Sequence, residues 1–234
     1  MKLCILENDD LDPAVEATYV GYGAMFERLL RDAGATGDFD IFNTVRGEYP
    51  PSFDPYDAVL LTGSRADSFS QEPWVLILRQ KVEELLKSKK KLIGVCFGHQ
   101  LIALCLGARV GRAPQGWGAG RMQYQWLAPE LPQAQGRTDV AMLASHQDQV
   151  FDLPEGTRLL ATSAFCPVAA FGVDDQVFCV QPHPEFVEDY SAFLLNKRRM
   201  VLGEPIYSAA TESLAQGHDG GDVARMMVAF IQGN

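Results

Sequence analysis

Short, wholly apolar runs alternate with longer amphipathic segments in the first hundred residues. The runs at 4–6, 58–61 and 92–95 are typical of parallel strands that are buried on both faces. Between the second and third runs, apolar side chains recur at the three- to four-residue spacing of a helix, at Trp74, Leu78, Val82 and Leu85. Strand, helix and strand in this order predict a βαβ unit of a parallel sheet.

An earlier amphipathic segment begins at Asp12-Pro13, where an acidic N-cap precedes a proline that the first helical turn tolerates. The pattern predicts one helix that ends at Gly34. Its apolar positions are Tyr19, Tyr22, Phe26, Leu29, Leu30 and Ala33. A second strand is expected at 38–43, before the loop that contains Pro50-Pro51.

Four further strands are predicted in the second half of the chain, and two helices follow them. The expected strands are 139–144, 158–162, 168–173 and 176–180. Asp174-Asp175 is expected to form a hairpin turn between the last two strands, so the sheet should be mixed. The expected helices are 187–199 and 222–231.

These elements predict a single α/β domain over residues 1–234. We expect a three-layer sandwich, in which helices flank a central mixed, mostly parallel sheet. The last part of the chain, from about 187 to 234, is expected to form a C-terminal helical extension.

Composition and charge exclude several classes of protein. The 234 residues are 47% hydrophobic and 21% charged, as in ordinary globular proteins. The formal net charge of -10 argues against a nucleic-acid or anionic membrane surface, because such partners favour dense basic patches. The short basic run at 87–91 is interpreted as the solvated end of a helix. No apolar run approaches the roughly 20 residues that a membrane helix requires.

The five cysteines are scattered and form no CxxC pair. They are Cys4, Cys96, Cys105, Cys166 and Cys179. Their spacing indicates neither a disulfide framework nor a zinc site, so a reducing, cytoplasmic location is expected. The segment 1–7 is predicted to be a first strand rather than a signal peptide, because acidic residues follow it at once.

One cysteine has a setting that suits catalysis. Cys96 lies in Gly94-Val95-Cys96-Phe97-Gly98-His99-Gln100, at a predicted junction of a strand and a helix. This is a cysteine version of the G-x-S-x-G nucleophile elbow, whose sharp turn exposes the nucleophile above the sheet. The N–H of Phe97 would point toward a developing oxyanion. The other four cysteines are interpreted as buried, inert thiols.

A general base must come from four histidines, His99, His146, His183 and His218. His183 is the best candidate, because it follows a predicted strand whose carboxyl end would lie beside the elbow. It belongs to Gln181-Pro182-His183-Pro184-Glu185-Phe186, and Glu185 could orient the imidazole. His146 is interpreted as a structural histidine.

The elbow followed some 80 residues later by His-Pro-Glu resembles the signature of the class I glutamine amidotransferases. The resemblance implies their flavodoxin-like fold and a catalytic triad of Cys96, His183 and Glu185. It also implies substrate contacts from Gln100 and from Ser145, Gln147 and Asp148, which match the family's Ser-His-Gly-Asp segment. The family's Gly-Gly-Pro oxyanion loop reads Gly63-Ser64-Arg65 here, so Gly63, Ser64 and Phe97 are the candidate oxyanion donors.

The resemblance implies hydrolysis of the γ-amide of glutamine or of a γ-glutamyl compound, through a γ-glutamyl thioester and without a metal or organic cofactor. A stand-alone hydrolase is favoured slightly over a glutaminase subunit that supplies ammonia to a separate synthase partner. The sequence is also compatible with a non-catalytic binding or regulatory protein, and with a cysteine hydrolase unrelated to glutamine. Gln100 and the 145–148 segment argue against the unrelated hydrolase, which would not need to bind an amino acid.

Overall fold

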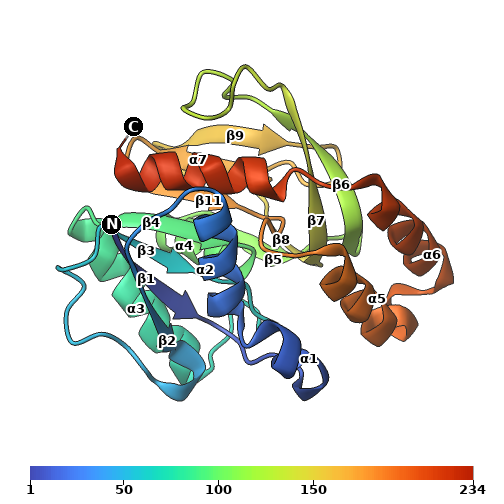
Figure 1. The fold of residues 1–234 in the computed structure, drawn as a ribbon, viewed down its shortest axis with the longest axis horizontal. Helices are drawn as coiled ribbons and strands as arrows, with labels where there is room; N and C mark the ends of the chain where they lie inside the picture. The colour runs from blue at the N-terminus through green and yellow to red at the C-terminus, as the bar shows by residue number, and fades with distance from the viewer. Residues whose placement is uncertain (234) are drawn as a thin grey trace.

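The computed structural model describes residues 1–233, which form a nine-stranded sheet and a separate two-stranded one (Figure 1). The order of the large sheet is β2-β1-β3-β4-β11-β10-β9-β6-β7. Its strands are β1 (Lys2–Glu7), β2 (Asp38–Asn43), β3 (Ala58–Leu61), β4 (Lys91–Val95), β6 (Gly118–Trp126), β7 (Asp139–His146), β9 (Arg158–Thr162), β10 (Ala170–Val173) and β11 (Val177–Val180). The small sheet pairs β5 (Val110–Arg112) with β8 (Asp148–Val150).

The five strands from β2 to β11 run parallel, and the four from β10 to β7 continue the sheet in antiparallel pairs. The fold is therefore the predicted mixed, mostly parallel α/β sandwich. The helices are α1 (Pro13–Tyr19), α2 (Tyr22–Asp32), α3 (Pro73–Lys87), α4 (Phe97–Cys105), α5 (Glu188–Leu202), α6 (Glu204–Ser213) and α7 (Gly220–Gln232).

Alternate residues of the parallel strands pack into two cores, one on each face of the sheet. On one face, Leu60 of β3 and Ile93 of β4 belong to a cluster with residues of α2 and α7. On the other face, Leu61 of β3 joins a cluster with residues of α3 and α4. Figure 1 shows α7 lying along the sheet beside α2. Burial on both faces is why these strands are apolar throughout.

The structure corrects two of the predicted helices and contains three strands, β5, β6 and β8, that the sequence did not predict. The single helix ending at Gly34 is two helices, because Val20 has a positive φ of 68° and interrupts the chain between α1 and α2. β6 was not expected, since two glycines and several polar residues hide its alternating burial. The predicted helix at 187–199 continues to Leu202, and α6 follows it as an additional helix. Within residues 1–233, every helix is too short or too polar to cross a lipid bilayer.

Candidate active site

The nucleophile candidate lies at the sharp turn between β4 and α4. Cys96 has φ 51° and ψ -101°, a conformation that L-residues rarely adopt and that active sites retain. A Cβ on Gly98 would lie 2.4 Å from the carbonyl oxygen of Leu61, so only glycine lets α4 pack this closely on β3. Cys96 remains 6% exposed. The sequence therefore forms the predicted elbow at the carboxyl edge of the sheet.

The loop after β11 brings His183 and Glu185 to the same edge. β11 pairs parallel to β4, and the N–H of Cys96 donates to the carbonyl oxygen of Val180 at 3.0 Å. The backbone N–H of His183 donates to the carbonyl oxygen of Leu143 at 2.8 Å, which ties the loop to β7. The two sequence motifs, more than 80 residues apart, are thus brought together.

His183 and Glu185 form a buried pair, and Nδ1 of His183 lies 2.7 Å from Oε1 of Glu185. The ring of His183 stacks on Phe186 with centroids 3.9 Å apart, which fixes its plane. Burial opposes the charged imidazolium, but the Glu185 carboxylate and the neighbouring Cys96 outweigh it and raise the pKa of His183 to about 10. The site therefore stabilises a protonated His183 beside the sulfur of Cys96.

The loop after β3 faces this pair and departs from the family pattern in sequence. A Cβ on Gly63 would lie 2.8 Å from Cε1 of His183 and 3.6 Å from Cβ of Cys96, so the loop passes directly over the catalytic side chains. Thr62 donates its hydroxyl to the carbonyl oxygen of Gly63 at 3.0 Å. Within residues 1–233, the backbone N–H groups of Gly63 and Ser64 have no acceptor, which leaves them available to an oxyanion.

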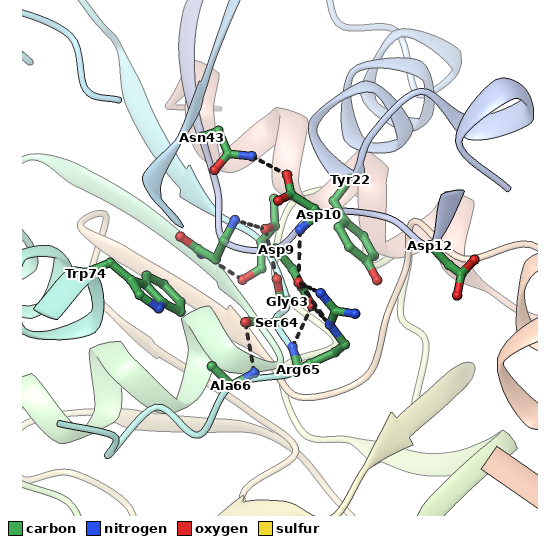
Figure 2. Close-up of polar contacts among 12 residues, drawn as sticks. Asp9, Asp10, Asp12, Tyr22, Asn43, Gly63, Ser64, Arg65, Ala66 and Trp74 are labelled. Carbon is green, nitrogen blue, oxygen red and sulfur yellow. Dashed lines mark hydrogen bonds and ion pairs between the residues drawn. The ribbon is translucent and has the colours of Figure 1, made fainter. Parts of the chain in front are cut away.

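Arg65 replaces the proline of the family loop and is held by Asp9 at the end of β1 (Figure 2). Its backbone N–H donates to Oδ2 of Asp9 at 2.8 Å, and its guanidinium donates to both carboxylate oxygens. The Asp9 side chain is 8% exposed. Asn8 also contacts the loop, since its side-chain amide donates to the carbonyl oxygen of Thr62 at 3.0 Å. A network of hydrogen bonds thus fixes the loop where the family uses a proline.

Two adjoining hollows open at Cys96. The first is lined by Gln100, Gln147, Asp148 and Arg112, and we call it the acyl hollow. The second is lined by His183, Phe186 and Tyr22, and we call it the base hollow. Ser64, Arg65, Ser145 and Arg198 line both. A larger cavity of about 400 Å³ lies at the amino end of β11, away from Cys96, and contains none of the candidate catalytic residues.

The predicted substrate contacts all line the acyl hollow, but the side-chain amide of Gln100 is already hydrogen-bonded within the protein. The amide of Gln100 donates to the carbonyl oxygen of Asp148 at 2.9 Å and to Oε1 of Gln181 at 3.1 Å. Gln100 therefore positions the backbone of the 145–148 segment. His146 is buried, and burial lowers its pKa to about 4, so it is a neutral structural residue at neutral pH.

An acidic pair that the sequence did not reveal lies in the acyl hollow. Burial and a hydrogen bond to Asp67 raise the pKa of Asp148 to about 6, against the opposing charge of Arg112. Arg112 contacts both carboxylates, at 3.1 Å each, and donates to Oε1 of Gln147 at 3.1 Å. This side of the cleft presents both charge signs, which suits an amino-acid zwitterion.

The sequence also missed Arg198 and Tyr22 as site residues, and they come from two distant segments of the chain. Arg198 of α5 lies over the ring of Trp117, at 5.2 Å from its centre. Tyr22, at the start of α2, accepts a hydrogen bond from the hydroxyl of Tyr190 at 2.7 Å. Neither periodicity nor a motif marks these residues as part of a site, and only their location in the folded chain does.

The remaining cysteines have no catalytic surroundings. Burial raises the pKa of Cys4, Cys105 and Cys166 to about 12, and raises that of Cys179 well above its ordinary value. All five cysteines are free thiols. High thiol pKa values fit inert side chains, since the thiolate is the nucleophile.

Comparisons with known proteins agree with this geometry. Residues 38–197 match the family Glutamine amidotransferase class-I. The chain is 34% identical to gamma-glutamyl peptidase 3 of Arabidopsis thaliana, over 74% of this chain and 72% of that protein. It is 37% identical to a glutamine-hydrolyzing GMP synthase of Caldicellulosiruptor saccharolyticus, over 41% of this chain and 19% of the synthase.

Structural similarity extends over the whole fold. The crystal structure of a glutamine amidotransferase from Thermotoga maritima superposes with a TM-score of 0.80 at 19% identity, covering 99% of this chain and 98% of that one. The nucleophile elbow, the buried His183–Glu185 pair and these similarities lead to one assignment. The chain belongs to the class I glutamine amidotransferase family and is an enzyme of this class.

Proposed function

We propose that the protein hydrolyses the γ-amide of glutamine or of a γ-glutamyl compound through a γ-glutamyl thioester on Cys96. The observation that carries the proposal is the juxtaposition of Cys96 with the buried pair of His183 and Glu185. The similarity to a gamma-glutamyl peptidase over 74% of the chain supports the same chemistry.

In the first step, the sulfur of Cys96 attacks the γ-carbonyl carbon. His183 accepts the thiol proton and holds it as an imidazolium, which Glu185 stabilises. The carbonyl oxygen becomes an oxyanion that receives hydrogen bonds from the N–H of Phe97 and of Gly63 or Ser64. His183 then gives its proton to the amide nitrogen, the C–N bond breaks, and the amine or ammonia leaves.

In the second step, water replaces the amine. The water oxygen attacks the thioester carbon while His183 takes a proton from the water. The N–H groups of Phe97 and of Gly63 or Ser64 again donate hydrogen bonds to the oxyanion. The C–S bond then breaks, the sulfur regains a proton from His183, and glutamate leaves. No metal or organic cofactor is needed for either step.

The acyl hollow is the proposed site of the glutamyl group. Gln147 and Asp148 line it, and Ser145 lies at its junction with the base hollow. The carboxylates of Asp67 and Asp148 suit the substrate's ammonium group, and Gln100 positions Asp148 by a hydrogen bond to its backbone carbonyl oxygen. The free thiols of the chain support a reducing, cytoplasmic compartment.

A second candidate function is a glutaminase that supplies ammonia to a separate synthase. The similarity to part of a GMP synthase favours it. The two functions share the chemistry at Cys96 and differ in whether a partner protein is needed for turnover.

Release of glutamate from glutamine and from a panel of γ-glutamyl amides and peptides tests the proposal, with Cys96→Ala as control. Turnover that disappears in Cys96→Ala supports an independent hydrolase. Without turnover, labelling of Cys96 by a glutamine-analogue electrophile would favour the partner-dependent glutaminase. Loss of both turnover and labelling would refute both functions and leave a non-catalytic protein.

A further inference from the structure

An arginine without an acidic partner lies beside the nucleophile. Arg198 lines both hollows at Cys96, and its backbone belongs to α5. Its neighbours on the helix are paired, Lys197 with Asp12 and Arg199 with Glu204. Within residues 1–233, no carboxylate forms an ion pair with Arg198. A half-buried guanidinium in a catalytic cleft is therefore left to bind an anion from outside the chain.

The surroundings of Arg198 orient its guanidinium for such a ligand. The ring of Trp117 lies under the guanidinium. The two hydrogen bonds of Arg198, to the carbonyl and hydroxyl oxygens of Ser145, both use Nη1. Nε and Nη2 have no acceptor within residues 1–233, so this edge of the fork is open. Two parallel N–H groups on one edge match the two oxygens of a carboxylate.

The position of Arg198 indicates which carboxylate of the substrate it binds. The acyl hollow already contains a cation and two carboxylates for the glutamyl zwitterion, in Arg112, Asp67 and Asp148. The base hollow contains His183, which protonates the leaving amine, so the leaving group must extend past this residue.

Resting on the proposed hydrolysis, we propose that Arg198 is a specificity-determining residue that binds a carboxylate on the leaving amine. The substrate class is then the γ-glutamyl amino acids and peptides with a free carboxyl terminus. Glutamine is a poorer substrate, because its leaving ammonia offers nothing for Arg198 to bind.

The test compares substrates that differ only in this charge. Rates are measured for γ-glutamyl-glycine and γ-glutamyl-glycylglycine, each as the free acid and as the C-terminal amide, and for glutamine. In the unmodified enzyme we expect kcat/KM for the better acid to exceed that of its amide by about 10-fold or more, as a charge-assisted pair contributes. In Arg198→Met the acid-to-amide ratio should fall to about 1, because the acids lose more of their rate than the amides and glutamine do.

Arg199→Met is the matched control, since it removes the same charge from the next residue of α5, which pairs with Glu204 away from the cleft. It should keep the acid-to-amide ratio of the unmodified enzyme. Alkylation of Cys96 by neutral iodoacetamide reports whether the site of Arg198→Met is intact.

Three results would overturn the inference. One is no preference for the acids in the unmodified enzyme, and another is an unchanged ratio in Arg198→Met. The third is an equal loss on acids, amides and glutamine with alkylation intact, which would assign Arg198 to the α-carboxylate of the glutamyl group. Failure to hydrolyse any γ-glutamyl compound would instead refute the proposed function itself.

Discussion

The hydrogen bonds between Asp9 and Arg65 should affect the catalytic rate, although Asp9 does not contact Cys96. Asp9 does not line either hollow, but its carboxylate holds the backbone N–H of Arg65, next to the proposed oxyanion donor Ser64. Replacing Asp9 by alanine removes this acceptor and the ion pair with the Arg65 guanidinium, while Asn8 still holds Thr62. We expect the loop to shift and the oxyanion donors to lose their alignment.

The magnitude follows from the burial of the partners. The guanidinium side chain of Arg65 is 59% exposed, so its ion pair contributes less than about 1 kcal/mol. Leaving the part-buried backbone N–H of Arg65 without an acceptor costs about 1 to 3 kcal/mol. We therefore expect the unfolding free energy to fall by about 2 kcal/mol. A misplacement of about 1 Å at the donor should lower kcat about 100-fold. KM should change little, since the donors act mainly in the transition state.

Two rates separate this effect from general damage. Hydrolysis of γ-glutamyl-p-nitroanilide requires the oxyanion donors, whereas alkylation of Cys96 by iodoacetamide forms no oxyanion. Asp9→Ala should reduce hydrolysis strongly and change alkylation less than about 3-fold. Asp10→Ala is the matched control, because the Asp10 carboxylate accepts a hydrogen bond from Asn43 (Figure 2) and pairs with Arg46. Within residues 1–233, it has no hydrogen bond to the loop. Equal losses in both rates, or unchanged hydrolysis, would refute the reasoning.

Three further substitutions test the site. Glu185→Gln should lower kcat about 10³- to 10⁴-fold in steady-state assays, because the buried imidazolium of His183 loses its counter-charge; a loss below 10-fold would contradict this role. Gly63→Ala should reduce turnover about 100-fold, since its Cβ would lie 2.8 Å from His183; full activity would place the loop elsewhere. Asp148→Asn should raise the unfolding free energy by about 1 to 3 kcal/mol at about pH 8 and little at about pH 4. The folded protein raises the pKa of Asp148 to about 6, so ionising this carboxylate destabilises the fold above pH 6 but not below the pKa of the unfolded chain. A gain in unfolding free energy that is the same at both pH values, measured by denaturant titration, would contradict this reasoning.

The parts of the fold that the sequence predicted are those that local patterns determine. The apolar strands and α3 are specified by burial and spacing within a few residues of each other. The break at Val20 depends on a distant group, because Glu7 of β1 accepts a hydrogen bond from the N–H of Gly23 at 2.8 Å at the start of α2. Gly21, the N-cap of α2, is a local signal of this break, but the contact with Glu7 lies outside the pattern of residues 12–34.

The candidate site divides in the same way. Cys96, His183 and Glu185 belong to short motifs whose chemistry needs those residue types in that order, so the sequence identified them and the structure brings them together. Their catalytic roles remain predictions. Arg198 and Asp67 are ordinary charged residues in the sequence, and only tertiary packing places them beside Cys96.

The departure from the family pattern at residue 65 leads to a last prediction. If the hydrogen bonds of Asp9 replace a proline, installing the family's residue should harm this protein. In Arg65→Pro the backbone N–H and the guanidinium both disappear, and the buried carboxylate of Asp9 keeps only the N–H of Asp10 among its present donors. We expect kcat to fall at least as far as in Asp9→Ala.

The double variant of Asp9→Ala with Arg65→Pro should recover part of that loss. It removes the unpaired carboxylate and leaves a proline to stiffen the loop. Steady-state kinetics of the two single variants and the double variant measure the coupling energy, which should be at least about 1 kcal/mol in favour of the double variant. Additive losses would show that Asp9 and Arg65 act independently, and would refute the idea that the hydrogen bonds of Asp9 compensate for the missing proline. Full activity of Arg65→Pro alone would show that the loop keeps its position without these hydrogen bonds.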